Sequence, residues 1–149
     1  GDTDLADAVV VGLDVGLRAG EFLKIKKQDV TKEGVILWDT KNNKPRTIPL
    51  TKRARAVLEV RAKTVTGDRL FPFKNNWYRD RWDRLRFVLK LDDVVFHTLR
   101  HTTASRLVQN GVPLVTVKEI MGHTTISTTM RYSHIKPSNL VAGIETLER

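Results

Sequence analysis

One short block of strand-forming residues interrupts a chain that is otherwise patterned for helices. Residues 35–38 are rich in strand formers, residues 42–43 are an Asn-Asn turn signal, and residues 46–49 alternate polar and apolar side chains. This pattern predicts a single β-hairpin. Pro45 and Pro49 lack an amide donor, so we expect the second strand to lie at an edge or to end quickly.

Apolar residues recur at helical spacing in the rest of the chain. Helices are expected from Leu5 to Gly16, from Glu21 to Ile25, from Thr51 to Lys63, from Asn75 to Lys90, from Thr98 to Asn110, from Pro113 to Met121, and around Leu140, Ile144 and Leu147. The predicted fold class is therefore α+β and mostly α-helical, with one small antiparallel hairpin in a single domain over residues 1–149.

Length and composition exclude several classes of protein. A chain of 149 residues with 40% hydrophobic content can bury a core. It has no cysteine, which excludes disulfides and thiolate chemistry. Because the sequence contains no run of eighteen apolar residues, we expect a soluble, cytoplasmic protein without a membrane segment. The first residue is Gly1, so we expect a processed chain or a fragment.

Positive charge is concentrated in the middle of the chain. The net charge is +9, but residues 41–90 alone hold fifteen basic and four acidic side chains, whereas residues 1–40 are net acidic. Such a segment attracts a polyanion and predicts binding that weakens steeply with salt. A solvated surface without a partner is the alternative interpretation.

The last third of the chain holds residues suited to chemistry on a phosphodiester. His97 and Arg100 stand three residues apart at the start of a predicted helix, which places them on one face. A guanidinium can hold two phosphate oxygens, and an imidazole can move a proton near neutral pH. His123 follows a glycine at a helix end, and Tyr132 follows a short segment expected to be helical. Each residue alone is commonly structural, but together they indicate DNA as the substrate.

Five separated motifs resemble those of the tyrosine recombinase, or phage integrase, family. They are Val15-Gly16-Leu17-Arg18-Ala19-Gly20-Glu21 (the arginine box), Lys41 with the Lys44–Leu50 segment after it, His97-Thr98-Leu99-Arg100-His101, Met121-Gly122-His123, and Met130-Arg131-Tyr132-Ser133-His134. The resemblance covers nearly the whole chain and implies the fold of the family's catalytic domain. It also implies six catalytic positions, namely Arg18, Lys41, His97, Arg100, His123 and Tyr132. Lys44 is the alternative catalytic lysine.

The resemblance implies a separate catalytic role for each of these side chains. Arg18 and Arg100 would clamp the scissile phosphate and stabilise the charge that builds on its oxygens. His123 would donate a further hydrogen bond to that phosphate. His97 would assist proton transfer, and Lys41 would protonate the departing 5′ oxygen.

Tyr132 would be the nucleophile. A free tyrosine titrates near pH ~10, so its attack on a phosphodiester needs activation. By resemblance, Tyr132 becomes linked to the DNA 3′ phosphate, and the freed 5′ hydroxyl later attacks to rejoin the strands. The implied enzyme is a site-specific recombinase that needs no cofactor, no ATP and no metal.

Two other functions fit parts of the pattern. His97 and His101 have the i, i+4 spacing of two metal ligands on a helix, which would suit a metal-dependent nuclease or hydrolase, although no convincing third ligand accompanies them. The basic segment of residues 41–90 would equally suit a DNA-binding module without catalysis.

The resemblance also sets expectations for partners. Double-stranded DNA is the expected partner, in the nucleoid of a bacterial or phage-infected cell, and a phage or mobile-element integrase is preferred over a chromosome-dimer resolvase. The family's N-terminal core-binding domain has no counterpart here, so the chain is expected to be a truncated catalytic domain. A homotetramer on DNA is expected, with residues 137–149 docking onto their own domain or a neighbour's. The sequence does not reveal the target site.

Overall fold

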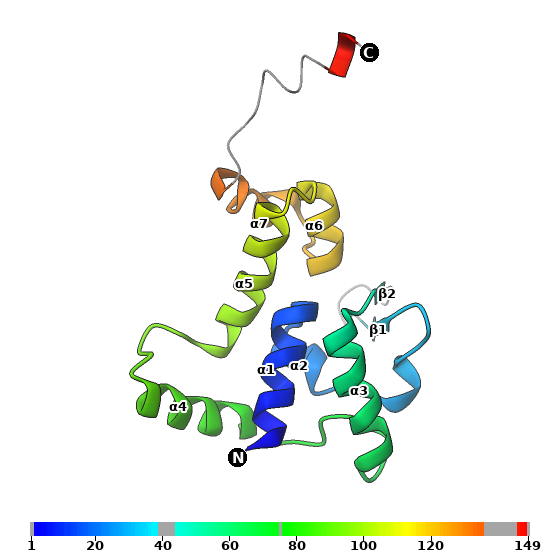
Figure 1. Ribbon diagram of the computed structural model, residues 1–149, viewed down its shortest axis with the longest axis vertical. Coiled ribbons are helices and arrows are strands. Elements are labelled where there is room, and N and C mark those ends of the chain that lie inside the picture. Colours follow the sequence, from blue (N-terminus) through cyan, green and yellow to red (C-terminus); the bar gives the residue numbers. More distant parts are fainter. Residues whose placement is uncertain (1, 39–43, 75, 136–145, 149) are drawn as a thin grey trace. The chain divides into compact units, whose positions relative to one another are not determined.

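The computed structural model describes residues 2–38, 44–74, 76–135 and 146–148. It is mostly helical, with one two-stranded antiparallel sheet (Figure 1). The elements are α1 Thr3–Val15, α2 Ala19–Phe22, η1 Lys27–Asp29, β1 Val35–Trp38, β2 Pro45–Ile48, α3 Lys52–Thr64, α4 Trp77–Leu89, α5 Phe96–Gln109, α6 Leu114–Met121, α7 Ile126–Met130, η2 Ser133–Ile135 and η3 Thr146–Glu148. The chain divides into two compact units, Gly1–Ala104 and Ser105–Arg149, with the boundary inside α5.

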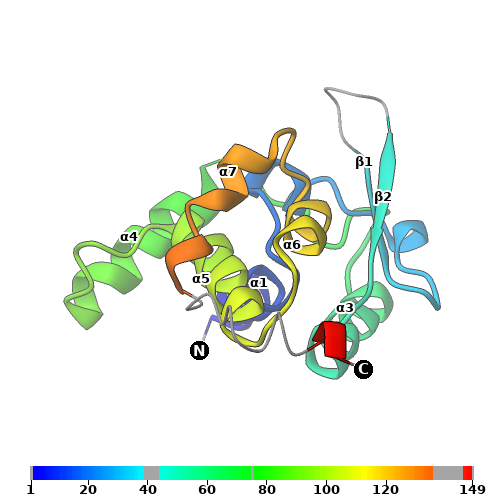
Figure 2. The same cartoon turned by 90° about the horizontal axis from the view of Figure 1, so that it is seen from above.

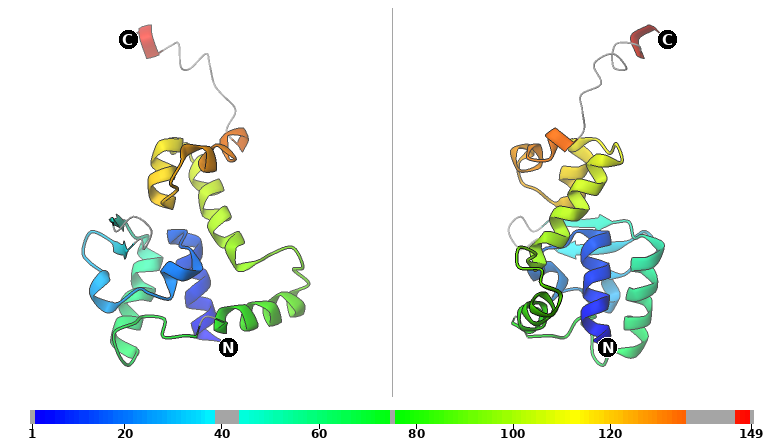
Figure 3. Two further views of the ribbon diagram at one scale, coloured as in Figure 1. Left: turned by 180° about the vertical axis from the view of Figure 1, so that it is seen from behind. Right: turned by 60° about the vertical axis from the view of Figure 1, so that its left-hand side comes forward.

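The core of the first unit forms around α1. This helix packs against α3 and α4, and Figure 3 shows it beside α3. Its buried residues follow the helical spacing expected from the sequence: Leu5, Ala8, Val11, Gly12 and Val15. Gly12 allows a close approach, because a Cβ there would lie 2.9 Å from Leu99 Cδ1 of α5. The first helix is therefore the central element of this unit.

The hairpin forms where the strand-forming block predicted it. Val35 pairs with Ile48 and Trp38 with Pro45, in antiparallel register. Figure 2 shows β1 and β2 side by side. Side chains alternate, so Val35 is buried while Trp38 is exposed. Pro49 lies outside the second strand, which ends quickly as expected.

The end of α1 is closed by a glycine in the left-handed conformation. Gly16 has φ 71° and ψ 35°, and its amide donates to the carbonyl of Gly12. A side chain at this φ would be strained, which is why glycine suits the position. The predicted helix end at Gly16 is confirmed, and the turn sends the chain directly into Arg18.

The next two short elements differ from the prediction. The expected helix Glu21–Ile25 instead begins at Ala19, because the Glu21 carboxylate accepts the Arg18 amide and starts the helix earlier. The 3₁₀ turn η1 was not predicted. Asp29 closes it by accepting the amide of Lys26 at 2.8 Å. Both elements are too short to show a periodic pattern.

The longer helices agree with prediction. Thr51 caps α3 by accepting the amide of Ala54, and α4 and α5 start within two residues of their expected positions. In the second unit, α6 buries Val117 and Met121 and ends at Gly122, again in the left-handed conformation. The expected terminal helix falls mainly on residues 136–145, outside the described residues. At Leu147 the structure describes a 3₁₀ turn.

A buried arginine links the first unit's helices. Arg61 of α3 donates through Nε to the carbonyl of Leu70 at 2.8 Å. Its Nη1 donates to Asp4 and Asp7 of α1, at 2.9 Å each. The guanidinium also lies 4.4 Å from the centre of the Phe71 ring. One side chain therefore joins α1, α3 and the segment after α3.

We expect Arg61→Ala to lower the free energy of unfolding by about 2–4 kcal/mol. The substitution would leave the Leu70 carbonyl without its donor and two neighbouring carboxylates without their shared cation. Urea denaturation followed by circular dichroism measures the effect. Lys63→Ala removes the same charge from an exposed position of α3 and should change stability by less than about 0.5 kcal/mol. Equal losses in both variants would contradict a specific role for Arg61.

Candidate active site

Arg18 occupies the turn between α1 and α2. Its side chain is 41% exposed and donates through Nη1 to Glu21 Oε1 at 3.1 Å, while its amide donates to Glu21 Oε2 at 2.9 Å. The carboxylate thus holds both the backbone and the side chain of Arg18. A guanidinium anchored on one carboxylate can also contact an anionic ligand through its solvent-exposed part.

Glu21 is nearly buried and receives a second guanidinium. Arg46 of β2 donates through Nη1 to Glu21 Oε1 at 2.8 Å. Burial alone would raise the pKa of Glu21, but the hydrogen bond and charge of Arg46, the Arg18 amide and the Arg18 charge outweigh it and hold that pKa below its ordinary value. Glu21 is therefore a carboxylate at neutral pH.

Arg100 fixes α5 to the carboxyl end of α1. Its side chain is buried, and Nη1 donates to the carbonyl of Gly16 at 2.6 Å. This position is favourable because the carboxyl end of a helix carries partial negative charge. Thr103, one turn further along α5, donates to the carbonyl of Leu13 at 2.9 Å. Arg18 and Arg100 are thereby brought to the same end of the same helix.

His97 lies in the first turn of α5, as predicted. Its ring is exposed and packs edge-on against His101, with 4.7 Å between ring centres. The two imidazoles are therefore neighbours, as the metal-site alternative requires. Within the part of the chain that the structure describes, however, no group of three or more His, Asp or Glu side chains is placed to hold a metal ion.

In the second unit, Thr129 connects two of the predicted residues. Its buried hydroxyl lies 2.8 Å from Nδ1 of His123, and its carbonyl accepts the amide of Tyr132 at 3.0 Å. A hydroxyl that donates to Nδ1 leaves the proton of a neutral imidazole on Nε2, which can then donate to a phosphate oxygen. Thr129 thus positions both His123 and the backbone of Tyr132.

Tyr132 follows Arg131, the residue that caps the carboxyl end of α7, and is 6% exposed. Its carbonyl accepts the amide of Ile135, so the backbone of Tyr132 is held on both sides. Lys41 lies outside the described residues. Lys44, the alternative catalytic lysine, is exposed just before β2.

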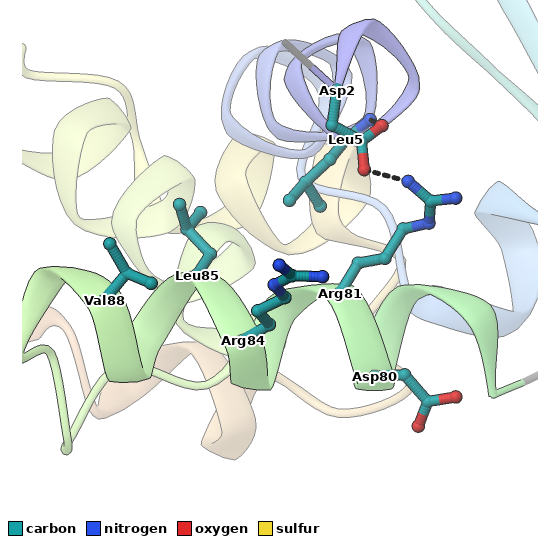
Figure 4. Close-up of a pocket in the computed structure, with 7 residues that line it drawn as sticks. All are labelled: Asp2, Leu5, Asp80, Arg81, Arg84, Leu85 and Val88. Carbon is teal, nitrogen blue, oxygen red and sulfur yellow. Dashed lines mark hydrogen bonds and ion pairs between the residues drawn. The ribbon is translucent and has the colours of Figure 1, made fainter.

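An open cavity of about 560 Å³ lies elsewhere, between α1 and α4 (Figure 4). Its lining is Asp2, Leu5, Asp80, Arg81, Arg84, Leu85 and Val88. In this cavity, Nη1 of Arg81 donates a hydrogen bond to Oδ2 of Asp2. The predicted catalytic residues that the structure describes are not part of this lining, so the cavity does not mark the candidate site.

Sequence reasoning missed two residues near the candidate site. These residues are Thr129 of α7 and Arg46 of β2. Arg46 has no local signal because its partner Glu21 lies 25 positions away in the sequence. Nothing in the sequence around Thr129 marks its hydroxyl as the partner of His123 Nδ1. The described ranges also contain no helix long and apolar enough to cross a lipid bilayer.

A family model described as the phage integrase family matches residues 3–139. The integrase of Haemophilus phage HP1 is 32% identical over 142 residues, which cover 95% of this chain and 40% of that protein. The integrase of Escherichia phage P2 is 33% identical over 146 residues, covering 96% of this chain and 41% of that protein. The chain thus spans about two fifths of the length of these curated relatives.

Among solved structures, the catalytic domain of bacteriophage HP1 integrase matches with a TM-score of 0.73 and 26% identity, covering 97% of this chain and 92% of that chain. The Tn1549 transposon integrase in complex with circular intermediate DNA matches with a TM-score of 0.79, covering 95% of this chain and 59% of that chain. At 21% identity this second likeness shows the fold alone. The predicted fold, that of a tyrosine recombinase catalytic domain, is confirmed.

The lowered pKa of Glu21 predicts a pH-dependent contribution to stability. A carboxyl group whose pKa is lower in the folded state stabilises the fold fully above its unfolded pKa, which is 4.5 for Glu21. That contribution is lost as pH falls through the lower folded value. The difference in unfolding free energy between the wild type and Glu21→Gln should therefore be constant from pH 6 to 8 and shrink below pH ~4. Urea denaturation at each pH measures it, and a difference unchanged at low pH would contradict the prediction.

Proposed function

The chain belongs to the phage integrase family, and on that premise we propose that it carries the catalytic site of a site-specific DNA recombinase. The observation that supports this most directly is the placement of Arg18 and Arg100 at the carboxyl end of α1. Two guanidiniums drawn from distant parts of the sequence suit the two non-bridging oxygens of one phosphate.

The proposed reaction is a transesterification. The phenolic oxygen of Tyr132 attacks the scissile phosphorus as the phenol loses its proton with the help of His97, and the bond from phosphorus to the 5′ oxygen breaks. Lys41 supplies the proton to that departing oxygen, which leaves a 3′-phosphotyrosyl link and a free 5′ hydroxyl. A 5′ hydroxyl then attacks the link, reforms a phosphodiester and returns Tyr132 to its starting form.

The remaining residues stabilise the negative charge that develops during this reaction. Negative charge builds on the non-bridging oxygens as the fifth bond forms, and positioned donors stabilise it. Arg18 and Arg100 supply guanidinium donors, and His123 supplies an imidazole donor. The contact of His123 Nδ1 with Thr129 supports that role, because it can leave the Nε2 proton for the phosphate.

Double-stranded DNA is the proposed substrate and partner. The net charge of +9 and the basic segment of residues 41–90 favour a polyanion. A structural neighbour, the Tn1549 integrase, is described in complex with DNA. We further propose that the protein integrates or excises a mobile element in a bacterial cell, and that it does so as a tetramer on DNA. In this proposal the subunits of the tetramer dock through residues 137–149. Most of these residues lie outside the part of the chain that the structure describes.

We expect the chain to form a covalent adduct with DNA that survives denaturant. The measurement is incubation at high protein concentration with a randomised pool of nicked suicide duplexes, followed by denaturing electrophoresis. Tyr132→Phe should abolish the adduct, because only the phenolic oxygen is lost. Tyr78→Phe removes the only other phenol and should leave adduct formation unchanged.

A wild-type chain that binds the duplexes without any adduct would identify a DNA-binding module instead of an enzyme. An adduct that forms in Tyr132→Phe and not in Tyr78→Phe would overturn the choice of nucleophile. Strand cleavage that excess chelator abolishes would favour the metal-dependent alternative.

We expect Arg18→Ala and Arg100→Lys to slow cleavage at least about a hundredfold while weakening DNA binding less than about tenfold. Both guanidiniums act most strongly where charge builds in the transition state. Lysine at position 100 keeps the positive charge and a donor for the Gly16 carbonyl, which limits damage to the fold. Single-turnover rates on the suicide duplex and fluorescence anisotropy provide the two readouts. Equal losses in both assays would assign these arginines to phosphate anchoring alone.

A further inference from the structure

Three charged side chains form a linked group beside the proposed phosphate site. Glu21 Oε1 accepts from Nη1 of Arg18 at 3.1 Å and from Nη1 of Arg46 at 2.8 Å. Glu21 Oε2 accepts the amide of Arg18 at 2.9 Å. The group joins α2, the turn before it and the second strand of the hairpin.

The charges of this group explain why two arginines share one carboxylate. A nearly buried Glu21 paired only with Arg18 would leave no net charge, and its attraction would compete with a phosphate for the Arg18 guanidinium. With Arg46 present, the group carries one net positive charge. Glu21 can then orient Arg18 without neutralising it.

Stability does not explain Arg46 well. Its side chain is 17% exposed, and its Nε is buried without a hydrogen-bond partner in the part of the chain that the structure describes. A buried donor without a partner costs free energy, and an apolar residue on this strand would avoid that cost. Arg46 stands opposite Leu37 in the sheet register, a position where apolar residues are ordinary.

We infer that Arg46 is a positioning residue for strand cleavage, which acts through Glu21 to aim Arg18 while leaving the positive charge of Arg18 for the phosphate. This inference rests on the proposed function. Arg46 need not touch DNA to act in this way. The lowered pKa of Glu21, to which Arg46 contributes both a hydrogen bond and a charge against the cost of burial, agrees with it.

The test is a double-mutant cycle on the full chain with the nicked suicide duplexes. Arg46→Gln should lower the single-turnover cleavage rate constant at least about tenfold, with DNA affinity changed less than about threefold. In the Glu21→Gln background, the same substitution should change the rate less than about twofold, since its intermediary is already gone. Arg46→Lys should restore most of the rate, because the contact with Glu21 is made through one nitrogen.

Two controls keep the outcome specific. Arg106→Gln removes the same charge from an exposed position of α5, outside the basic segment of residues 41–90, and should cleave like the wild type. Thermal denaturation checks that each variant folds, and Arg46→Met, which removes the buried Nε, replaces Arg46→Gln if that variant unfolds. Carbon-13 NMR should find a higher pKa for Glu21 in Arg46→Gln than in the wild type.

The inference is overturned if Arg46→Gln cleaves at the wild-type rate, or if it slows cleavage equally in the wild-type and Glu21→Gln backgrounds. The second result would show that Arg46 acts independently of Glu21. A wild-type chain that forms no adduct would instead refute the proposed function. In that case an unchanged Glu21 pKa in Arg46→Gln would separately refute the link between Arg46 and Glu21.

Discussion

The hydrogen bond from Arg100 to the carbonyl of Gly16 is the contact on which the candidate site of the first unit depends. The last carbonyls of a helix have no partner within it, and the carbonyl of Gly16, which caps α1 in the left-handed conformation, also needs a partner outside the helix. Arg100 satisfies it from another helix. The same contact therefore fixes α5 to the carboxyl end of α1 and holds Arg100 at Gly16, whose neighbours in the sequence include Arg18.

The sequence predicted the parts of the fold that follow from local patterns. The hairpin of residues 35–48 and the longer helices have a repeating pattern with recognisable ends, such as Thr51 and Gly16. Short elements were predicted less well. The start of α2 depends on the Glu21 carboxylate, and η1 depends on Asp29, and a single capping side chain leaves no periodic signal.

Some residues of the candidate site could likewise be predicted from the sequence, and others could not. Arg18, His97, Arg100, His123 and Tyr132 were found because a family's motifs preserve residue type and order, although their catalytic roles stay predictions. Contacts between side chains that are not adjacent in the sequence could not be predicted from it. Arg46 and Glu21 meet because a strand and a helix pack together, and Thr129 contacts His123 through a turn between two helices. Residues that support a site are therefore harder to predict than the residues that form it.

Arginines hold α1 near both of its ends, with Arg61 on Asp4 and Asp7 and Arg100 on Gly16. Each residue of an α-helix turns the chain by about 100° and advances it by about 1.5 Å. One residue inserted between these two anchors would leave at least one of them facing the wrong way. The structure consequently constrains the length of this helix more tightly than its exposed residue types, and we expect homologous chains to tolerate substitutions in α1 far more readily than insertions or deletions.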